Sequence, residues 1–319
     1  MVVTHHSRTC VFGLACGLSL ARKGILLISR VYRPLNLAEC FQRFGKYKGP
    51  VPVGYSVNFL GAKSKDAYTT DVIRPLFGAS TEVETQYPGA TEEYFEWVDL
   101  LEAVLSAGEQ FTFMELGAGF GRWSVNAALA SAQLGKSYRI VAIEPEPTHF
   151  NWLEQNIQDN GVDVAKCELV EAAMARTNGE TEFYIGNPTA WYGQAVKSSW
   201  ANIITEDMKK HGVHFGRVKT VALGDFLKKY CKVDLIDLDV QYAEFEVLDA
   251  AKSLLSAVVK RVHIGTHSHE IEGNLRGLFR GLGWAPKFDF ECLGNRQTPM
   301  GVIDFRDGVQ AWINPALAV

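Results

Sequence analysis

The sequence predicts a doubly wound α/β fold, with a mostly parallel, Rossmann-like sheet of seven strands and an antiparallel edge strand. Three observations lead to this fold class. Short apolar runs alternate with helical patterns from about residue 90 onward. A glycine-rich turn at residues 117–121 joins the first run to a helix, as in open α/β sheets that bind nucleotides. Two last runs are typical of a closing antiparallel hairpin.

Composition narrows the class of protein. The chain has 319 residues, of which 47% are hydrophobic, and this is ample for a buried core. Its 36 acidic and 32 basic residues give a formal net charge of −4. This balance argues against a broad basic surface, so we expect no nucleic-acid partner. A homo-oligomer remains open.

The cysteines and other ligand-type residues predict no bound metal. Six cysteines are scattered without Cys-x-x-Cys spacing, at Cys10, Cys16, Cys40, Cys167, Cys231 and Cys292. We interpret them as reduced thiols of a cytoplasmic protein, and we expect neither a disulfide framework nor a zinc site.

The first 90 residues are predicted to be an N-terminal extension and lead-in, followed by one domain over 91–319. The apolar run at 11–21 is interrupted by Arg22 and Lys23, and no stretch approaches the ~20 residues of a membrane span. We therefore expect an added helical segment or an extended start rather than a cleaved signal, without stable membrane insertion. Residues 34–90 lack sustained periodicity, and we interpret them as a loose lead-in that can cover a ligand crevice.

The elements of the domain follow in chain order. Thr91 can cap a helix over 91–105, whose apolar stripe consists of Tyr94, Val98, Leu101 and Leu105. Strands are predicted at 111–116, 138–143, 168–174, 180–185 (in a hairpin), 233–240 and 259–265. Helices are predicted at 122–134, 148–159, 225–230, 243–255 and 270–282. The closing hairpin pairs 287–292 with 308–313.

Glu115 ends the first strand directly before the glycine turn. A carboxylate there would repel a pyrophosphate, but it suits a cationic ligand such as S-adenosylmethionine, which carries sulfonium and ammonium groups. A nicotinamide cofactor would favour Gly-x-Gly-x-x-Gly, whereas this chain has Gly-x-Gly-x-Gly. An ordinary turn with a coincidental Glu is the remaining alternative.

Glu144 ends the next strand, about twenty residues beyond the glycine turn. That spacing places a second acid where it can accept hydrogen bonds from both ribose hydroxyls of a nucleoside. Pro145 and Pro147 then open a helix, which is predicted to stop at Asn160-Gly161. A solvated Glu at a helix entry is the alternative.

Polar residues at the ends of two later strands are candidates for catalysis. Asp237 and Asp239 alternate along one strand and therefore share a face. His263, His267 and His269 are expected to cluster at the end of the next strand, where one can act as a general base with a pKa near working pH. A divalent-metal site is an alternative without a recognised ligand spacing. Residues 191–194 can line an acceptor pocket or simply pack.

Four blocks resemble the FkbM-like branch of class I S-adenosylmethionine-dependent methyltransferases. They are Glu115-Leu-Gly-Ala-Gly-Phe-Gly, Ala142-Ile-Glu-Pro, Val233-Asp-Leu-Ile-Asp-Leu-Asp-Val-Gln-Tyr-Ala-Glu-Phe-Glu-Val-Leu, and Val262-His-Ile-Gly-Thr-His-Ser. The resemblance covers roughly residues 90–315. Members usually have Asp-Val-Glu-Gly-Ala-Glu in the third block, so Gln241 and Tyr242 depart from the usual Glu-Gly pair.

The resemblance implies a set of site residues. The glycine turn would face the methionine part of the cofactor, Glu144 the ribose, and the segment near Ala173 the adenine. The candidate cofactor-binding residues are Glu115, Gly117, Ala118, Gly119, Gly121, Glu144, Pro145, Ala173, Met174 and Asp237. The candidate catalytic pair is Asp239 and His267.

These expectations combine into a function. The resemblance implies an S-adenosylmethionine-dependent methyltransferase, and the missing Asn-Pro-Pro-Tyr-type signature favours O-methylation of a small molecule, sugar or lipid-linked acceptor. Two alternatives remain, a nicotinamide-dependent oxidoreductase and a non-catalytic S-adenosylmethionine-binding protein on the same fold. The sequence does not identify the acceptor.

Overall fold

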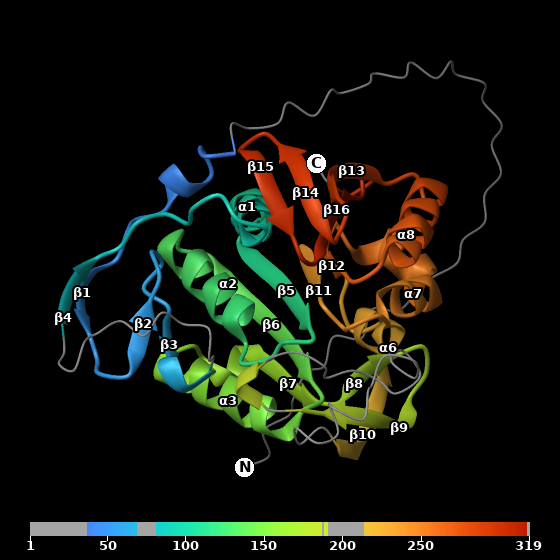
Figure 1. The fold of residues 1–319 in the computed structure, drawn as a ribbon, viewed down its shortest axis with the longest axis horizontal. Helices are drawn as coiled ribbons and strands as arrows, with labels where there is room; N and C mark the ends of the chain where they lie inside the picture. Colours follow the sequence, from blue (N-terminus) through green and yellow to red (C-terminus); the bar gives the residue numbers. More distant parts are fainter. Residues whose placement is uncertain (1–36, 69–80, 187, 191–213, 318–319) are drawn as a thin grey trace, which may run out of the picture. The chain divides into compact units, whose positions relative to one another are not determined.

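The structure is a computed structural model in which residues 37–68, 81–186, 188–190 and 214–317 are described (Figure 1). The apolar run at 11–21 and the candidate acceptor loop at 191–194 lie outside these residues. None of the helices in the described ranges is long and apolar enough to cross a membrane.

Seven strands form the central sheet of the described residues, in the order β13-β16-β12-β11-β5-β6-β7. Strands β12, β11, β5, β6 and β7 are parallel, whereas β16 is antiparallel to both of its neighbours. The predicted fold class is confirmed, but the antiparallel strand lies beside the edge strand β13 rather than at the edge. The bounds are Ala285–Phe290 (β13), Gly308–Ile313 (β16), Arg261–Thr266 (β12), Leu235–Leu238 (β11), Gln110–Leu116 (β5), Ser137–Glu144 (β6) and Cys167–Glu171 (β7).

The strand order reverses beside β5. The chain runs outward through β5, β6 and β7, and then returns to place β11 on the other side of β5. In open α/β sheets, ligands bind outside the carboxyl ends of the strands at such a switch point. The topology therefore directs the search for a site to the ends of β5 and β11.

Helices cover both faces of this sheet (Figure 1). On one face lie α1 (Glu93–Ser106), α2 (Arg122–Gln133) and α3 (Pro147–Asp159), and on the other α6 (Leu223–Leu227), α7 (Glu244–Val258) and α8 (His269–Gly281). The pleat of β5 serves both layers, because Phe111 and Phe113 point into the first core, and Met114 and Leu116 into the second.

Local signals set several helix ends. Helix α3 begins at Pro147, and the carboxylate of Glu146 accepts a hydrogen bond from the His149 backbone N–H at 2.7 Å. It ends before Gly161, whose φ is 64°, as the Asn-Gly pair predicted. The predicted Thr91 cap was wrong, because α1 has Glu92 at its N-cap position without a side-chain cap hydrogen bond.

The predicted strand at 168–174 divides in two. Its first part, β7, joins the central sheet, and its second part, β8 (Ala173–Ala175), joins a small sheet of order β8-β10-β9. Strand β9 (Gly179–Ile185) pairs antiparallel with β10 (His214–Ala222), which the sequence analysis missed. A second unpredicted pair, β14 (Gly294–Thr298) and β15 (Gly301–Phe305), lies between β13 and β16 in the chain.

The lead-in contributes to the core rather than forming a loose segment. Its strands are short antiparallel pairs, β1 (Lys48–Val51) with β4 (Thr81–Glu84) and β2 (Tyr55–Val57) with β3 (Lys63–Lys65). Phe41 and Phe59 are buried, and they pack against Tyr94 and Trp97 of α1, respectively. Each buried aromatic side chain removes a large apolar area from water, so these contacts hold the segment on α1. The domain boundary at residue 90 stays a prediction.

Candidate active site

A cavity of about 700 Å³ lies at the carboxyl ends of β5, β6, β11 and β12. This volume is typical of small-molecule sites, which span roughly 300–1,000 Å³. Its lining contains all of the predicted site residues except Gly121 and His267. Ser56, Asn58 and Lys65 of the lead-in also line it, as does Asp307 before β16.

The glycine turn needs glycine because of its backbone. Gly117, Gly119 and Gly121 all have positive φ, at 86°, 52° and 71°. A Cβ on Gly121 would lie 2.2 Å from the Leu153 side chain, so this glycine permits α2 to pack on α3. The Gly119 N–H donates to Glu144 Oε2 at 2.7 Å, which links the turn to the end of β6.

Glu115 is held by the first turn of α2. Its carboxylate accepts hydrogen bonds from the backbone N–H groups of Trp123 at 3.2 Å and Ser124 at 2.8 Å. Burial raises the pKa of Glu115 to about 8, although these hydrogen bonds act in the opposite direction. Glu115 therefore fixes the turn and also lines the cavity.

Glu144, at the end of β6, is hydrogen-bonded to the glycine turn. Besides the bond from Gly119, its Oε1 accepts from the Glu146 N–H at 2.9 Å. The side chain is buried, and burial raises its pKa to about 8. The carboxyl group is thus oriented at the tip of β6 before any ligand arrives.

Asp237 shares the cavity with a partner that the sequence did not indicate. Glu96 of α1 hydrogen-bonds to it, and burial raises the pKa of Asp237 to about 6 and that of Glu96 well above its usual range. Two adjacent carboxyl groups in a buried place cannot both ionise readily, so the pair retains a proton near neutral pH. The carboxyl oxygens of Glu96 and Asp237 form part of the cavity wall.

His267 is surrounded by carboxylates. Its Nδ1 lies 2.8 Å from Glu244 Oε1, and its Nε2 lies 3.4 Å from Asp239 Oδ1 and 3.8 Å from Asp307 Oδ1. The side-chain amide of Gln241 lies 2.9 Å from Nε2. Asp239 is half exposed and lines the cavity, whereas His267 lies behind it.

The three histidines do not form the predicted cluster. His263 is buried between β12 and α1, where its Nδ1 lies 2.6 Å from Asp99, and it also borders the cavity. His269 begins α8 and bonds to Glu272 at 3.0 Å. They separate because His263 lies within a pleated strand, His267 beyond its end and His269 on a helix.

The pKa expected for His267 also needs correction. Burial alone would lower the pKa of its imidazole, but the carboxylates of Asp239, Glu244 and Asp307 outweigh burial and raise it to about 9. At neutral pH the ring is therefore a cation and cannot accept a proton from a substrate. Asp239, which faces the cavity, is the remaining acceptor of the pair.

The cavity as a whole is acidic. Its basic and imidazole groups are fewer than its carboxyl groups, and Arg122 makes a bidentate pair with Glu93 at 2.7 Å for both bonds. Fixed carboxyl groups in an enclosed space favour a cationic ligand. They are Glu92, Glu93, Glu96, Glu115, Glu144, Asp237, Asp239 and Asp307.

Comparison with known proteins decides the family. The model of the methyltransferase FkbM domain matches residues 115–282, more than half of the chain. The chain belongs to the FkbM methyltransferase family. A putative methyltransferase from Jannaschia sp. strain CCS1 is 25% identical over 252 residues, which cover 78% of this chain and 88% of that protein.

Two solved structures are similar to this FkbM-family chain at low identity. A methyltransferase FkbM from Methylobacillus flagellatus KT is 11% identical, with a TM-score of 0.42, and the match covers 70% of this chain and 55% of that one. A precorrin 8W decarboxylase from Methanobacterium thermoautotrophicum is 16% identical, with a TM-score of 0.39, covering 71% and 92%.

The departure at Gln241 and Tyr242 has a visible backbone consequence. Both residues have positive φ, 50° and 75°, where the usual Glu-Gly pair of FkbM methyltransferases would place a glycine at the second position. A bulky residue in this region costs about 1–2 kcal/mol. The Tyr242 ring packs on His267 with ring centroids 5.4 Å apart, and Gln241 contacts both members of the Asp239–His267 pair.

Sequence reasoning missed several residues that complete the site. Glu244 had a signal, since it stands in the third family block, and its carboxylate now proves to hold His267. Glu96 had none, because it lies within a helix, away from any strand end or glycine turn. Asp307 stands at the amino end of β16, whereas the sequence analysis considered the carboxyl ends of parallel strands. Only their packing against β11 and His267 brings them to the site.

Proposed function

We propose that the protein is an S-adenosylmethionine-dependent methyltransferase that O-methylates a small molecule, sugar or lipid-linked acceptor. One observation carries this proposal: an acidic cavity at the sheet's switch point is bounded by a positive-φ glycine turn and by Glu144. S-adenosylmethionine is a cation with a ribose, and both features suit this lining.

The residues present fit this cofactor. Glu144 stands at the tip of β6 with its carboxyl group aimed at the turn, where it can accept ribose hydroxyl hydrogen bonds. Ala173 and Met174 supply apolar surface to the same cavity, which suits an adenine ring. The Glu96–Asp237 pair and Asp239 supply negative or partly negative groups for the ammonium and sulfonium. Gly117 and Gly119 keep side chains out of the space beside them.

The chemistry assigned to the chain is positioning and proton removal. Bound there, S-adenosylmethionine would supply an electrophilic methyl group to an attacking oxygen. Asp239 accepts the proton of the acceptor hydroxyl, because it directly follows β11 at the switch point of the sheet, lines the cavity and is half exposed. The His267 cation, itself held by Glu244, keeps Asp239 oriented as an anion. Holding the two reactants in line supplies much of the remaining rate enhancement.

The acceptor is proposed to be a small molecule or glycan in the cytoplasm, with no nucleic acid involved. Polar groups of the lead-in, Ser56 and Asn58 among them, line the cavity and can contact hydroxyls of such a compound. The net charge of −4 supports an acceptor other than a polyanion.

Two experiments test the proposal. Calorimetry with S-adenosylmethionine and NAD in parallel is expected to show binding of the first and none of the second. Transfer of a labelled methyl group is then measured across a panel of hydroxylated metabolites and sugars. NAD binding would favour the oxidoreductase alternative, and binding of S-adenosylmethionine without transfer to any acceptor would favour a non-catalytic binding protein.

A further inference from the structure

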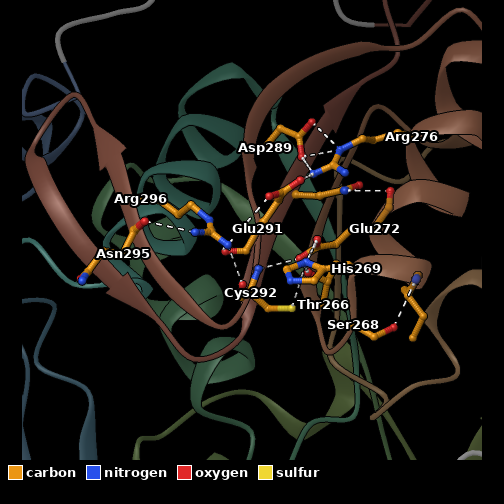
Figure 2. Close-up of polar contacts among 12 residues, drawn as sticks. Thr266, Ser268, His269, Glu272, Arg276, Asp289, Glu291, Cys292, Asn295 and Arg296 are labelled. Carbon is orange, nitrogen blue, oxygen red and sulfur yellow. Dashed lines mark hydrogen bonds and ion pairs between the residues drawn. The ribbon is translucent and has the colours of Figure 1, made fainter.

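A second group of chemically distinctive side chains lies outside the cavity, at the first turn of α8 (Figure 2). His269 and Glu272 come from this helix, and Cys292 follows the end of β13. His269 Nδ1 lies 3.0 Å from Glu272 Oε2 and 3.9 Å from Cys292 Sγ. One ligand-type atom from each residue lies within 4.8 Å of the others.

We propose that His269, Glu272 and Cys292 form a Zn²⁺ site with solvent at the fourth position. Imidazole, carboxylate and thiolate are the three ligand types that zinc takes in proteins. Tetrahedral zinc with ordinary bond lengths separates N from O by about 3.4 Å and N from S by about 3.6 Å. The observed separations of 3.0 and 3.9 Å differ from these by less than half an ångström.

The carboxylate of Glu272 is already oriented for this role. It is fully buried, and its Oε1 accepts hydrogen bonds from Thr266 Oγ1 at 3.1 Å and from the Cys292 N–H at 2.7 Å. This leaves Oε2 facing His269, as Figure 2 shows. Outer partners of this kind are a regular feature of protein metal sites, where they fix the ligand.

Gly308 shows how closely the region is packed around this carboxylate. A Cβ at that position would lie 2.4 Å from Glu272 Oε1 and 2.3 Å from Thr266 Oγ1. The carboxylate therefore has no room to turn away from His269. Such rigid placement lowers the entropy cost of coordination.

A metal ion can reach this group from the solvent-exposed side of His269. The His269 side chain is 58% exposed, so an ion can arrive from solvent and retain a water ligand there. Coordination by Cys292 requires the thiolate, and the displaced thiol proton passes to solvent. The ion would join the start of α8 to the segment after β13.

Cobalt(II) is the probe of choice for the test, because its spectrum reports thiolate ligation. The full chain, stripped of metal with a chelator, is titrated with Co²⁺ and then with Zn²⁺. We expect a thiolate-to-cobalt charge-transfer band together with visible bands of tetrahedral intensity, and displacement of both by Zn²⁺. Zn²⁺ should also raise the melting temperature.

Substitutions show which residues produce the charge-transfer band and hold the metal ion. Cys292→Ser should abolish the charge-transfer band and weaken Zn²⁺ binding by at least about 100-fold, more than the 10–100-fold typical of losing an outer partner. Thr266→Val, which removes one bond to Glu272, should weaken it by about 10-fold. Cys231→Ser is the matched control, because Cys231 is an exposed cysteine outside the group, and it should behave as wild type.

Two results of the Co²⁺ titrations would overturn the site. One is a charge-transfer band that survives in Cys292→Ser, and the other is bound Co²⁺ without any thiolate band. The second would point to an oxygen and nitrogen site such as Asp239, Glu244 and His267. His269→Ala decides the matter if Cys292→Ser fails to fold, because the His269 side chain is largely exposed and its removal opens no cavity in the apolar core. Wild-type Zn²⁺ affinity in that variant would also overturn the site.

Discussion

The backbone carbonyl oxygen of Asp239 lies 1.8 Å from the position that a Cβ on Gly117 would occupy. The first residue after β5 and the first residue after β11 thus meet backbone to backbone, at the point where the strand order reverses. Gly117 also has a φ of 86°. Both the shape of the cavity and the position of Asp239 depend on this contact.

Gly117→Ala is therefore expected to damage both stability and binding. The added methyl group clashes with backbone that cannot rotate away, and the positive φ adds strain. The free energy of unfolding should therefore fall by about 1–3 kcal/mol. S-adenosylmethionine affinity should fall because Asp239 and the turn move apart. Denaturant unfolding and calorimetry measure the two effects. Gly108→Ala is the control, since nothing lies within 4 Å of a Cβ there; equal behaviour of the two variants would contradict the role of Gly117.

Glu144→Ala should weaken S-adenosylmethionine binding by about 1.5–3 kcal/mol, as expected for lost charge-assisted hydrogen bonds. Calorimetry measures the change, and circular dichroism checks the fold. Glu171→Ala is the matched control, because Glu171 pairs in register with Glu144 on β7 but is exposed. Unchanged affinity in a folded Glu144 variant would remove this residue from the site.

Binding of the cofactor near neutral pH should release protons. Burial raises the pKa of Glu115 and of Glu144 to about 8, so both carboxyl groups are largely protonated at pH 7 without ligand. A cation beside them favours the charged form and lowers both pKa values, so binding tightens as the pH rises from about 6 toward 8. Calorimetry in two buffers of different ionisation enthalpy counts the protons. Identical enthalpies in both buffers would show that neither group titrates on binding.

Asp239→Asn should lower kcat by roughly 10²–10⁴, because the amide cannot accept the acceptor's proton. It should also weaken cofactor binding, because one negative group beside the cationic cofactor is lost. His267→Gln should lower kcat less, since it removes only the cation that orients Asp239. Methyl transfer to the acceptor found in the panel provides the rates. Asp304→Asn on β15 is the control. Near-wild-type kcat in Asp239→Asn would assign proton removal to solvent or to another group.

The glycine turn and the two strand-end acids were predictable because their signals are local. A strand, its terminal residue and the following turn occupy neighbouring positions in the chain, so their geometry follows from sequence spacing and backbone sterics. The same holds for α3, with Pro147 at its start and Gly161 after its end. The single strand predicted at 168–174 was wrong, because side chains alternate with the same two-residue period whether a segment stays in one sheet or passes from one sheet into another.

The sequence by itself determined the order of the strand–helix units that place β5, β6 and β11, and hence that the ends of these three strands share one edge of the sheet. The tertiary structure decided which side chains meet there. Glu96 reaches Asp237 only because α1 packs on β12, the neighbour of β11, and Cys292 reaches His269 only through the course of the chain after β13. The physical reason is that such neighbours result from the burial of apolar surface over the whole domain, which no short window of sequence contains.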